Sequence, residues 1–298
     1  MAETQKRSPL AIWIAAIRPK TLGAAVAPVL VGTAMAWDAG GFHALAALCA
    51  LLGALLIQIG TNFSNDYADF LKGADTSARK GPMRVTQAGL VAPETMKRAT
   101  VLVFALAFVA GLYLIWRGGW PILVIGVLSI LSGVLYTVGR YSLAYLGLAD
   151  VFVLIFFGPV AVGGTYYVQA LEINAVVLIV GLAPGLLSMA ILLINNIRDV
   201  EEDRQAGKKT LVVRLGKRFG IGLYVFCVVV AVLIPLWLFL ITGQHPWAVS
   251  VIIIILFALP ILHELLSDPD PVALNPLLGA TGRMLLIYSV VFAIGWVI

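Results

Sequence analysis

Two clusters of asparagine and aspartate occur in a chain that carries few charged residues. Asn65 and Asp69 are four residues apart in the first cluster, and Asn195 and Asp199 repeat that spacing in the second. Residues three or four apart lie on one face of a helix, so each cluster presents its amide and carboxylate oxygens on one side. Because Mg²⁺ prefers a few carboxylates together with phosphate oxygens, the clusters predict a site that holds a diphosphate through a metal ion.

The predicted metal ligands come from both clusters and are Asp66, Asp69, Asp75, Asp199 and Asp203. A single aspartate at the end of a membrane helix would be read as an ordinary polar cap. Two matched clusters beside apolar segments favour a liganded site instead, because carboxylates gathered near a bilayer are costly unless they are paired or liganded.

Basic residues flank the two clusters, and we predict that they bind the same anion. A diphosphate carries more negative charge than one metal ion neutralises, and lysine and arginine can complete the neutralisation. The predicted basic contacts are Lys72, Arg79, Arg84, Arg140, Lys208 and Lys209. Four asparagines and one tyrosine complete the predicted substrate-binding set: Asn62, Asn65, Asn195, Asn196 and Tyr136.

The amino-acid composition indicates that the chain is a membrane protein. Of the 298 residues, 61% are hydrophobic and 12% are charged, whereas a soluble domain has about 25% charged residues. The apolar runs are continuous and do not alternate, which predicts helices and not a barrel. We therefore expect membrane lipid, and no nucleic acid, as the partner of the surface.

Nine apolar segments are long enough to predict membrane spans: 10–36, 43–64, 99–116, 120–138, 146–168, 174–197, 219–241, 247–265 and 279–298. Pro19 and Pro28 are expected to break the first. If the N-terminus is inside, all of the 20 lysines and arginines except Arg117 fall on the inner side. The positive-inside rule then places the N-terminus and two long loops, 65–98 and 198–218, in the cytoplasm.

The fold class that follows is all-α, a polytopic membrane bundle of about nine helices that forms a single domain over 1–298. The two clusters are separated by four predicted spans, which suggests two pseudo-repeated four-helix halves followed by a ninth helix. Membrane proteins built from internal repeats commonly have their site at the junction of the repeats. The two cytoplasmic loops would then cap one site.

The residues of the two clusters resemble the two aspartate-rich motifs of the UbiA superfamily of intramembrane prenyltransferases. The resemblance covers nearly the whole chain. Residues 17–22, 72–82 and 195–211 are most similar to the branch whose acceptor is 1,4-dihydroxy-2-naphthoate, the MenA type. One departure from the superfamily pattern concerns Asp75, which follows Asp69 by six residues where four are usual.

The resemblance implies a Mg²⁺-dependent enzyme in the bacterial cytoplasmic (inner) membrane, with a lipid-open central cavity. It would transfer a polyprenyl group from polyprenyl diphosphate to 1,4-dihydroxy-2-naphthoate with loss of CO₂, giving demethylmenaquinol in menaquinone biosynthesis. The catalytic residues would be Asp66, Asp69, Asp199 and Asp203, which act through the metal ion.

Two alternatives remain open at this point. A related prenyltransferase could use another acceptor, such as 4-hydroxybenzoate or homogentisate. A cation-coupled transporter would also need carboxylates, but it should place them near the middle of the membrane, whereas these clusters lie at the ends of spans. Arg18 and Lys20 fit either an anchor for the membrane topology or a clamp on the acceptor's carboxylate.

Overall fold

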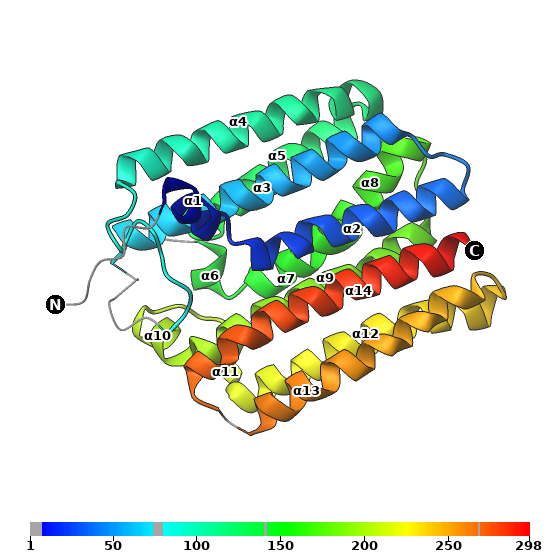
Figure 1. Ribbon diagram of the computed structural model, residues 1–298. Helices are drawn as coiled ribbons and strands as arrows, with labels where there is room; N and C mark the ends of the chain where they lie inside the picture. The colour runs from blue at the N-terminus through cyan, green and yellow to red at the C-terminus, as the bar shows by residue number, and fades with distance from the viewer. Residues whose placement is uncertain (1–7, 74–79, 140–141, 268) are drawn as a thin grey trace.

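The protein is a bundle of long helices, described here from a computed structural model that covers the chain except residues 1–7, 74–79, 140–141 and 268 (Figure 1). In chain order the helices are α1 (Pro9–Ile17), α2 (Pro19–Asp38), α3 (Ala44–Leu71), α4 (Pro93–Gly118), α5 (Trp120–Leu135), α6 (Leu143–Leu146), α7 (Ala149–Ile155), η1 (Phe156–Val160), α8 (Ala161–Ala170), α9 (Ala175–Arg198), α10 (Val200–Gln205), α11 (Leu211–Leu215), α12 (Lys217–Thr242), η2 (Pro246–Ile253), α13 (Ile254–Leu266), η3 (Pro271–Leu274) and α14 (Asn275–Val297).

Eight segments within the described residues are long and apolar enough to cross a membrane: Pro19–Asp38, Ala44–Leu71, Pro93–Gly118, Ala149–Ala170, Ala175–Arg198, Lys217–Thr242, Pro246–Leu266 and Pro271–Val297. The remaining predicted span corresponds to α5, which has 16 residues and is about 24 Å long, less than the roughly 30 Å of a bilayer core. The predicted fold class is confirmed, and the chain is a multi-pass integral membrane protein.

The first predicted span is divided at Arg18, whose φ of 57° ends α1 and begins α2. Pro19 takes the first position of α2, where its missing N–H costs no hydrogen bond. The prediction that Pro28 also breaks this span is wrong, because Pro28 lies inside the continuous helix α2 and is buried. Neighbouring helices make such an interior proline tolerable in a membrane protein.

The boundary predicted after the second span also differs from the structure. Helix α3 continues to Leu71, and α4 begins at Pro93, so both ends of the predicted 65–98 loop are helical. The helix can continue because its last turns bury polar side chains that have partners, among them Asn62, Asp66 and Asp69. The first cluster therefore lies on a helix, and the segment that joins it to α4 is shorter than predicted.

The ends of α3 and α9 that carry the two clusters lie at the same end of the bundle, together with the short helices α1, α6, α10 and α11 (Figure 1). The first and last long helices, α2 and α14, pack side by side and close the bundle. A Cβ added at Gly282 would come within 2.9 Å of the Lys20 carbonyl oxygen, so glycine permits this approach. The fold thus brings two clusters distant in sequence to one face.

Candidate active site

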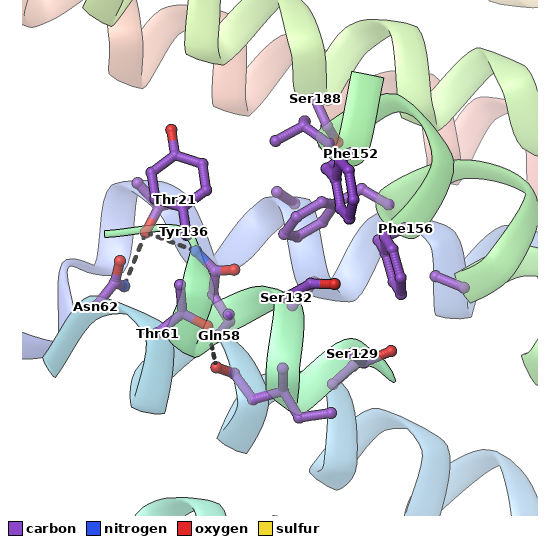
Figure 2. Close-up of a pocket in the computed structure, with 18 of the residues that line it drawn as sticks. Thr21, Gln58, Thr61, Asn62, Ser129, Ser132, Tyr136, Phe152, Phe156 and Ser188 are labelled. Atoms are coloured by element: carbon purple, nitrogen blue, oxygen red, sulfur yellow. Dashed lines mark hydrogen bonds between the residues drawn. The ribbon is translucent and has the colours of Figure 1, made fainter. Parts of the chain in front are cut away.

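A cavity of about 420 Å³ extends between the helices from this polar end of the bundle into its apolar part. Helices α2, α3, α5, α7, α8 and α9 supply most of its wall. Figure 2 shows Thr21, Gln58, Asn62 and Tyr136 on one side of the cavity and Phe152 and Phe156 on another. The cavity therefore combines a polar region with an aromatic, apolar one.

Carboxylates from both clusters line the same cavity. Asp69 comes from α3, Asp199 from the end of α9, and Asp203 from α10. The asparagines of the clusters that also line it are Asn62, Asn65, Asn195 and Asn196. The sequence-based grouping of the two clusters around one space thus agrees with their placement, whereas their roles in metal binding stay predictions.

Asp66 is placed differently from Asp69, Asp199 and Asp203. It is 2% exposed and does not belong to the cavity wall. Its two oxygens accept hydrogen bonds from the backbone N–H groups of Thr86, at 3.0 Å, and Val85, at 3.2 Å. Asp66 therefore anchors the segment between α3 and α4. To bind a metal ion, as predicted, it would have to give up these hydrogen bonds.

Each of the three aspartates that line the cavity has a cationic partner. Arg84 Nη2 lies 2.7 Å from Asp69 Oδ2, and Lys208 Nζ lies 3.0 Å from Asp203 Oδ1. Arg198 donates from Nε and Nη2 to the two carboxylate oxygens of Asp199. Arg84 and Lys208 also line the cavity, so both could reach a phosphate there.

The Lys208 ammonium keeps its positive charge in spite of its partial burial. Burial acts to lower the pKa of the Lys208 ammonium, but the carboxylates of Asp203 and Asp69 raise it more, so the pKa lies above its ordinary value. Burial raises the pKa of Asp203, and the Lys208 charge opposes that rise. Lys208 therefore remains a cation at neutral pH and faces the cavity as one.

The donor set at the polar end fits a metal ion that the substrate helps to hold. Among the described residues, no three side chains of His, Cys, Asp or Glu lie close enough together to hold a metal by themselves. Mg²⁺ is usually bound by one or two carboxylates plus substrate phosphates, and it keeps some waters. Asp69, Asp199 and Asp203 face one cavity, so one or two of them together with the phosphates of a bound substrate would meet this requirement.

Two further polar groups on the cavity wall also point to a bound molecule. Asn196 Nδ2 and Ser188 Oγ are buried and have no hydrogen-bond partner in the structure. Buried polar groups nearly always have a partner in folded proteins. A bound substrate or ordered water in the cavity would satisfy both.

Other predicted site residues hold the polar end together. Asn62 Nδ2 donates to the Ile17 carbonyl at 2.8 Å and to Thr21 Oγ1 at 3.2 Å, which fixes the junction of α1 and α2. Asn65 Oδ1 accepts from Thr137 Oγ1 at 2.6 Å, which fixes the end of α5.

The predicted basic contacts separate into distinct groups in the structure. Lys72 is outside the cavity wall, donates to the carbonyls of Thr137 and Gly139 at 2.5 and 3.0 Å, and lies over the Tyr145 ring. Lys209 is exposed and is also outside the wall. Asp75, Arg79 and Arg140 lie outside the described residues, so their predicted roles have no structural account.

Sequence reasoning missed several residues of the site. Thr21, Gln58 and Ser188 are isolated polar residues in apolar helices, and their positions gave only a weak signal. Glu202 lines the cavity beside Asp203, and its sequence position within the second cluster was a usable signal. Arg198 also lines the cavity; it lies within the second cluster, but the sequence pattern gave it no role.

The chain is thus a polytopic helical bundle around a cavity that is charged at one end and mostly apolar in its remainder. Comparison with known families identifies the class more closely. The chain belongs to the UbiA prenyltransferase family, whose model matches residues 25–295.

Two curated relatives match over nearly their whole length. The 1,4-dihydroxy-2-naphthoate octaprenyltransferase of Escherichia coli (strain K12) is 39% identical, covering 95% of this chain and 94% of that protein. The enzyme of the same name from Haemophilus influenzae is 35% identical, with 97% and 96% covered. A UbiA homolog from Archaeoglobus fulgidus bound to GPP and Mg²⁺ superposes with a TM-score of 0.63 at 16% identity, covering 94% of this chain and 99% of that one, which shows the shared fold.

Proposed function

We propose that this chain transfers a polyprenyl group from polyprenyl diphosphate to 1,4-dihydroxy-2-naphthoate, with loss of CO₂, to give demethylmenaquinol. The observation that carries the proposal is that Asp69, Asp199 and Asp203 all line the polar end of one cavity whose remainder is mostly apolar. An isoprenoid diphosphate has the same division between head and tail. The names of the full-length relatives support the choice of acceptor.

The polar end would bind and activate the diphosphate. Mg²⁺, held by one or two of the carboxylates Asp69, Asp199 and Asp203 together with phosphate oxygens, would supply positive charge to the leaving group. Arg84 and Lys208 would add charge-assisted hydrogen bonds to phosphate oxygens, and these contacts strengthen as the C–O bond breaks. Ionisation of an allylic diphosphate needs this stabilisation, because the departing diphosphate takes both bonding electrons.

The apolar part of the cavity would hold the prenyl chain and protect the allylic cation from water. Phe152 and Phe156 stack with ring centroids 5.8 Å apart, and both face the cavity. Aromatic faces attract cations, so these rings are suited to a site where positive charge develops on carbon. The electron-rich acceptor ring then attacks the cation, and its carboxylate leaves as CO₂.

We further propose that the polar end of the bundle faces the cytoplasm, with the N-terminus on the same side. The distribution of lysine and arginine supports this orientation, since the topology predicted from the sequence places 19 of the 20 on the inner side and Arg117 on the outer side. The acceptor and the metal ion would then reach the cavity from the cytoplasm, while the prenyl chain would remain in the bilayer.

The acceptor is tested with the purified protein in lipid vesicles, a labelled prenyl diphosphate and Mg²⁺. We expect prenylation of 1,4-dihydroxy-2-naphthoate with release of one CO₂ per product, and at least about tenfold weaker use of 4-hydroxybenzoate or homogentisate, because buried polar groups reject ligands that leave them unpaired. Preferred use of either other acceptor would contradict the acceptor assignment. Failure to prenylate any of the three would contradict the proposed function.

A further inference from the structure

Asn275, the first residue of α14, contacts the segments that carry both clusters. Its Nδ2 donates a hydrogen bond to the backbone carbonyl of Lys80 at 2.9 Å. Its Oδ1 accepts a hydrogen bond from Arg198 Nη1, also at 2.9 Å. Asn275 is not part of the cavity wall, so it acts on the site through these two neighbours.

Arg198 connects Asn275 to the second cluster by hydrogen bonds. Arg198 is 3% exposed, and it donates from Nε and Nη2 to the two carboxylate oxygens of Asp199, at 2.6 and 2.7 Å. The contact with Asn275 uses the remaining nitrogen, Nη1. A planar guanidinium bonded through all three nitrogens has one orientation, and that orientation fixes the direction of the Asp199 carboxylate.

The Lys80 backbone connects Asn275 to the first cluster. Its N–H donates to Glu202 Oε1 at 2.9 Å, so the peptide groups on its two sides are held by α10 and α14. The chain then continues to Arg84, which pairs with Asp69, and to Thr86, whose N–H binds Asp66. In Figure 1 this segment, in cyan, extends from near α10 to the start of α4.

We infer that Asn275 is a positioning residue that fixes the position of the two acidic clusters relative to each other. It orients Asp199 through Arg198, and it fixes the start of the segment that brings Arg84 to Asp69. The inference rests on the proposed function, since the relative position of the clusters matters most where one metal–diphosphate unit must contact both of them. The acceptor should not depend on this relative position, because the cluster groups that Asn275 positions are ones that would face the diphosphate; its further hydrogen bond, to the Val272 carbonyl at 3.1 Å, is local to η3.

The test compares Asn275→Ala with the wild-type protein. We expect the KM for prenyl diphosphate and the half-saturating Mg²⁺ concentration to rise about tenfold, the usual effect of losing a hydrogen bond to a charged group. The KM for the acceptor should stay within about twofold. Asn174→Ala is the matched control, because this asparagine caps the start of α9 locally through Val177, whereas the second cluster lies at the other end of that helix. Lys80→Ala should resemble the wild type, since only its backbone forms these bonds.

A second readout needs neither metal nor substrate. Hydrogen–deuterium exchange in the metal-free protein should become about tenfold faster at residues 80–86 in Asn275→Ala and should be unchanged inside α14. Asn275→Asp, which retains an oxygen for Arg198 but loses the donor to Lys80, should show the same faster exchange and serves if the alanine variant does not fold. Unchanged exchange, or equal rises in both KM values, would overturn the inference. An inactive wild type would instead refute the proposed function, and exchange would still decide the role of Asn275.

Discussion

Replacement of Asp69 or Asp199 by alanine is expected to reduce prenyl transfer by about 100-fold or more. Each carboxylate faces the cavity, and each would contribute to the charge that stabilises the departing diphosphate. Loss of a single preorganised electrostatic contact in an active site typically costs about 100- to 1,000-fold in turnover. Steady-state assays in vesicles, at saturating Mg²⁺ and both substrates, measure the effect.

The asparagine variants separate this chemical effect from misfolding. Asp199→Ala leaves Arg198 buried without its carboxylate, which is destabilising in itself. Asp199→Asn and Asp69→Asn keep the shape and one oxygen, and we expect them to be nearly as inactive as the alanine variants while the protein folds normally. Glu94→Gln is the control, an exposed carboxylate on the first turn of α4 at the same end of the bundle. Turnover near the wild-type level in both asparagine variants would refute the two-cluster site.

Lys208→Gln is expected to weaken prenyl transfer by about 10- to 150-fold. A net contribution of ~1.5–3 kcal/mol from a charge-assisted hydrogen bond to phosphate corresponds to that range. The change should appear in the KM for prenyl diphosphate or in the rate of its ionisation, and the KM for the acceptor should change little. Kinetics with each substrate varied in turn distinguish these cases.

The neighbouring Lys209→Gln is the matched control for this variant. The sequence alone assigned both lysines to the diphosphate, but Lys209 is exposed and lies outside the cavity wall, whereas Lys208 pairs with Asp203 on it. We therefore expect Lys209→Gln to act within about twofold of the wild type. Equal losses in the two variants would mean that the diphosphate is bound by general positive charge and not by a placed lysine.

The sequence predicted the parts of this site that depend on local periodicity. A spacing of four residues puts Asn65 and Asp69 on one helical face, and the same holds for Asn195 and Asp199. The apolar runs predicted the spans and their order. Helix boundaries were less well predicted. Helix α3 continues to Leu71 because its last polar side chains have partners inside the protein, and hydropathy carries no information about such partners.

Contacts between distant segments were beyond the sequence pattern. Periodicity indicates which residues share a helix face, but it does not say which other helix that face meets. Lys72 and Arg84 are both basic residues near the first cluster, yet Lys72 binds backbone carbonyls while Arg84 binds Asp69. Asn275 had no signal at all, because its partners Lys80 and Arg198 are far away in the chain.

The central claim is that both acidic clusters serve one metal-dependent diphosphate site. Its most direct test is equilibrium binding of a non-ionising prenyl thiolodiphosphate, measured with and without Mg²⁺ in the wild type, Asp69→Asn and Asp199→Asn. We predict that Mg²⁺ strengthens binding to the wild type by at least about tenfold, and that either single variant loses most of this Mg²⁺-dependent gain. Wild-type binding that is indifferent to Mg²⁺, or a full Mg²⁺-dependent gain in either variant, would contradict the claim.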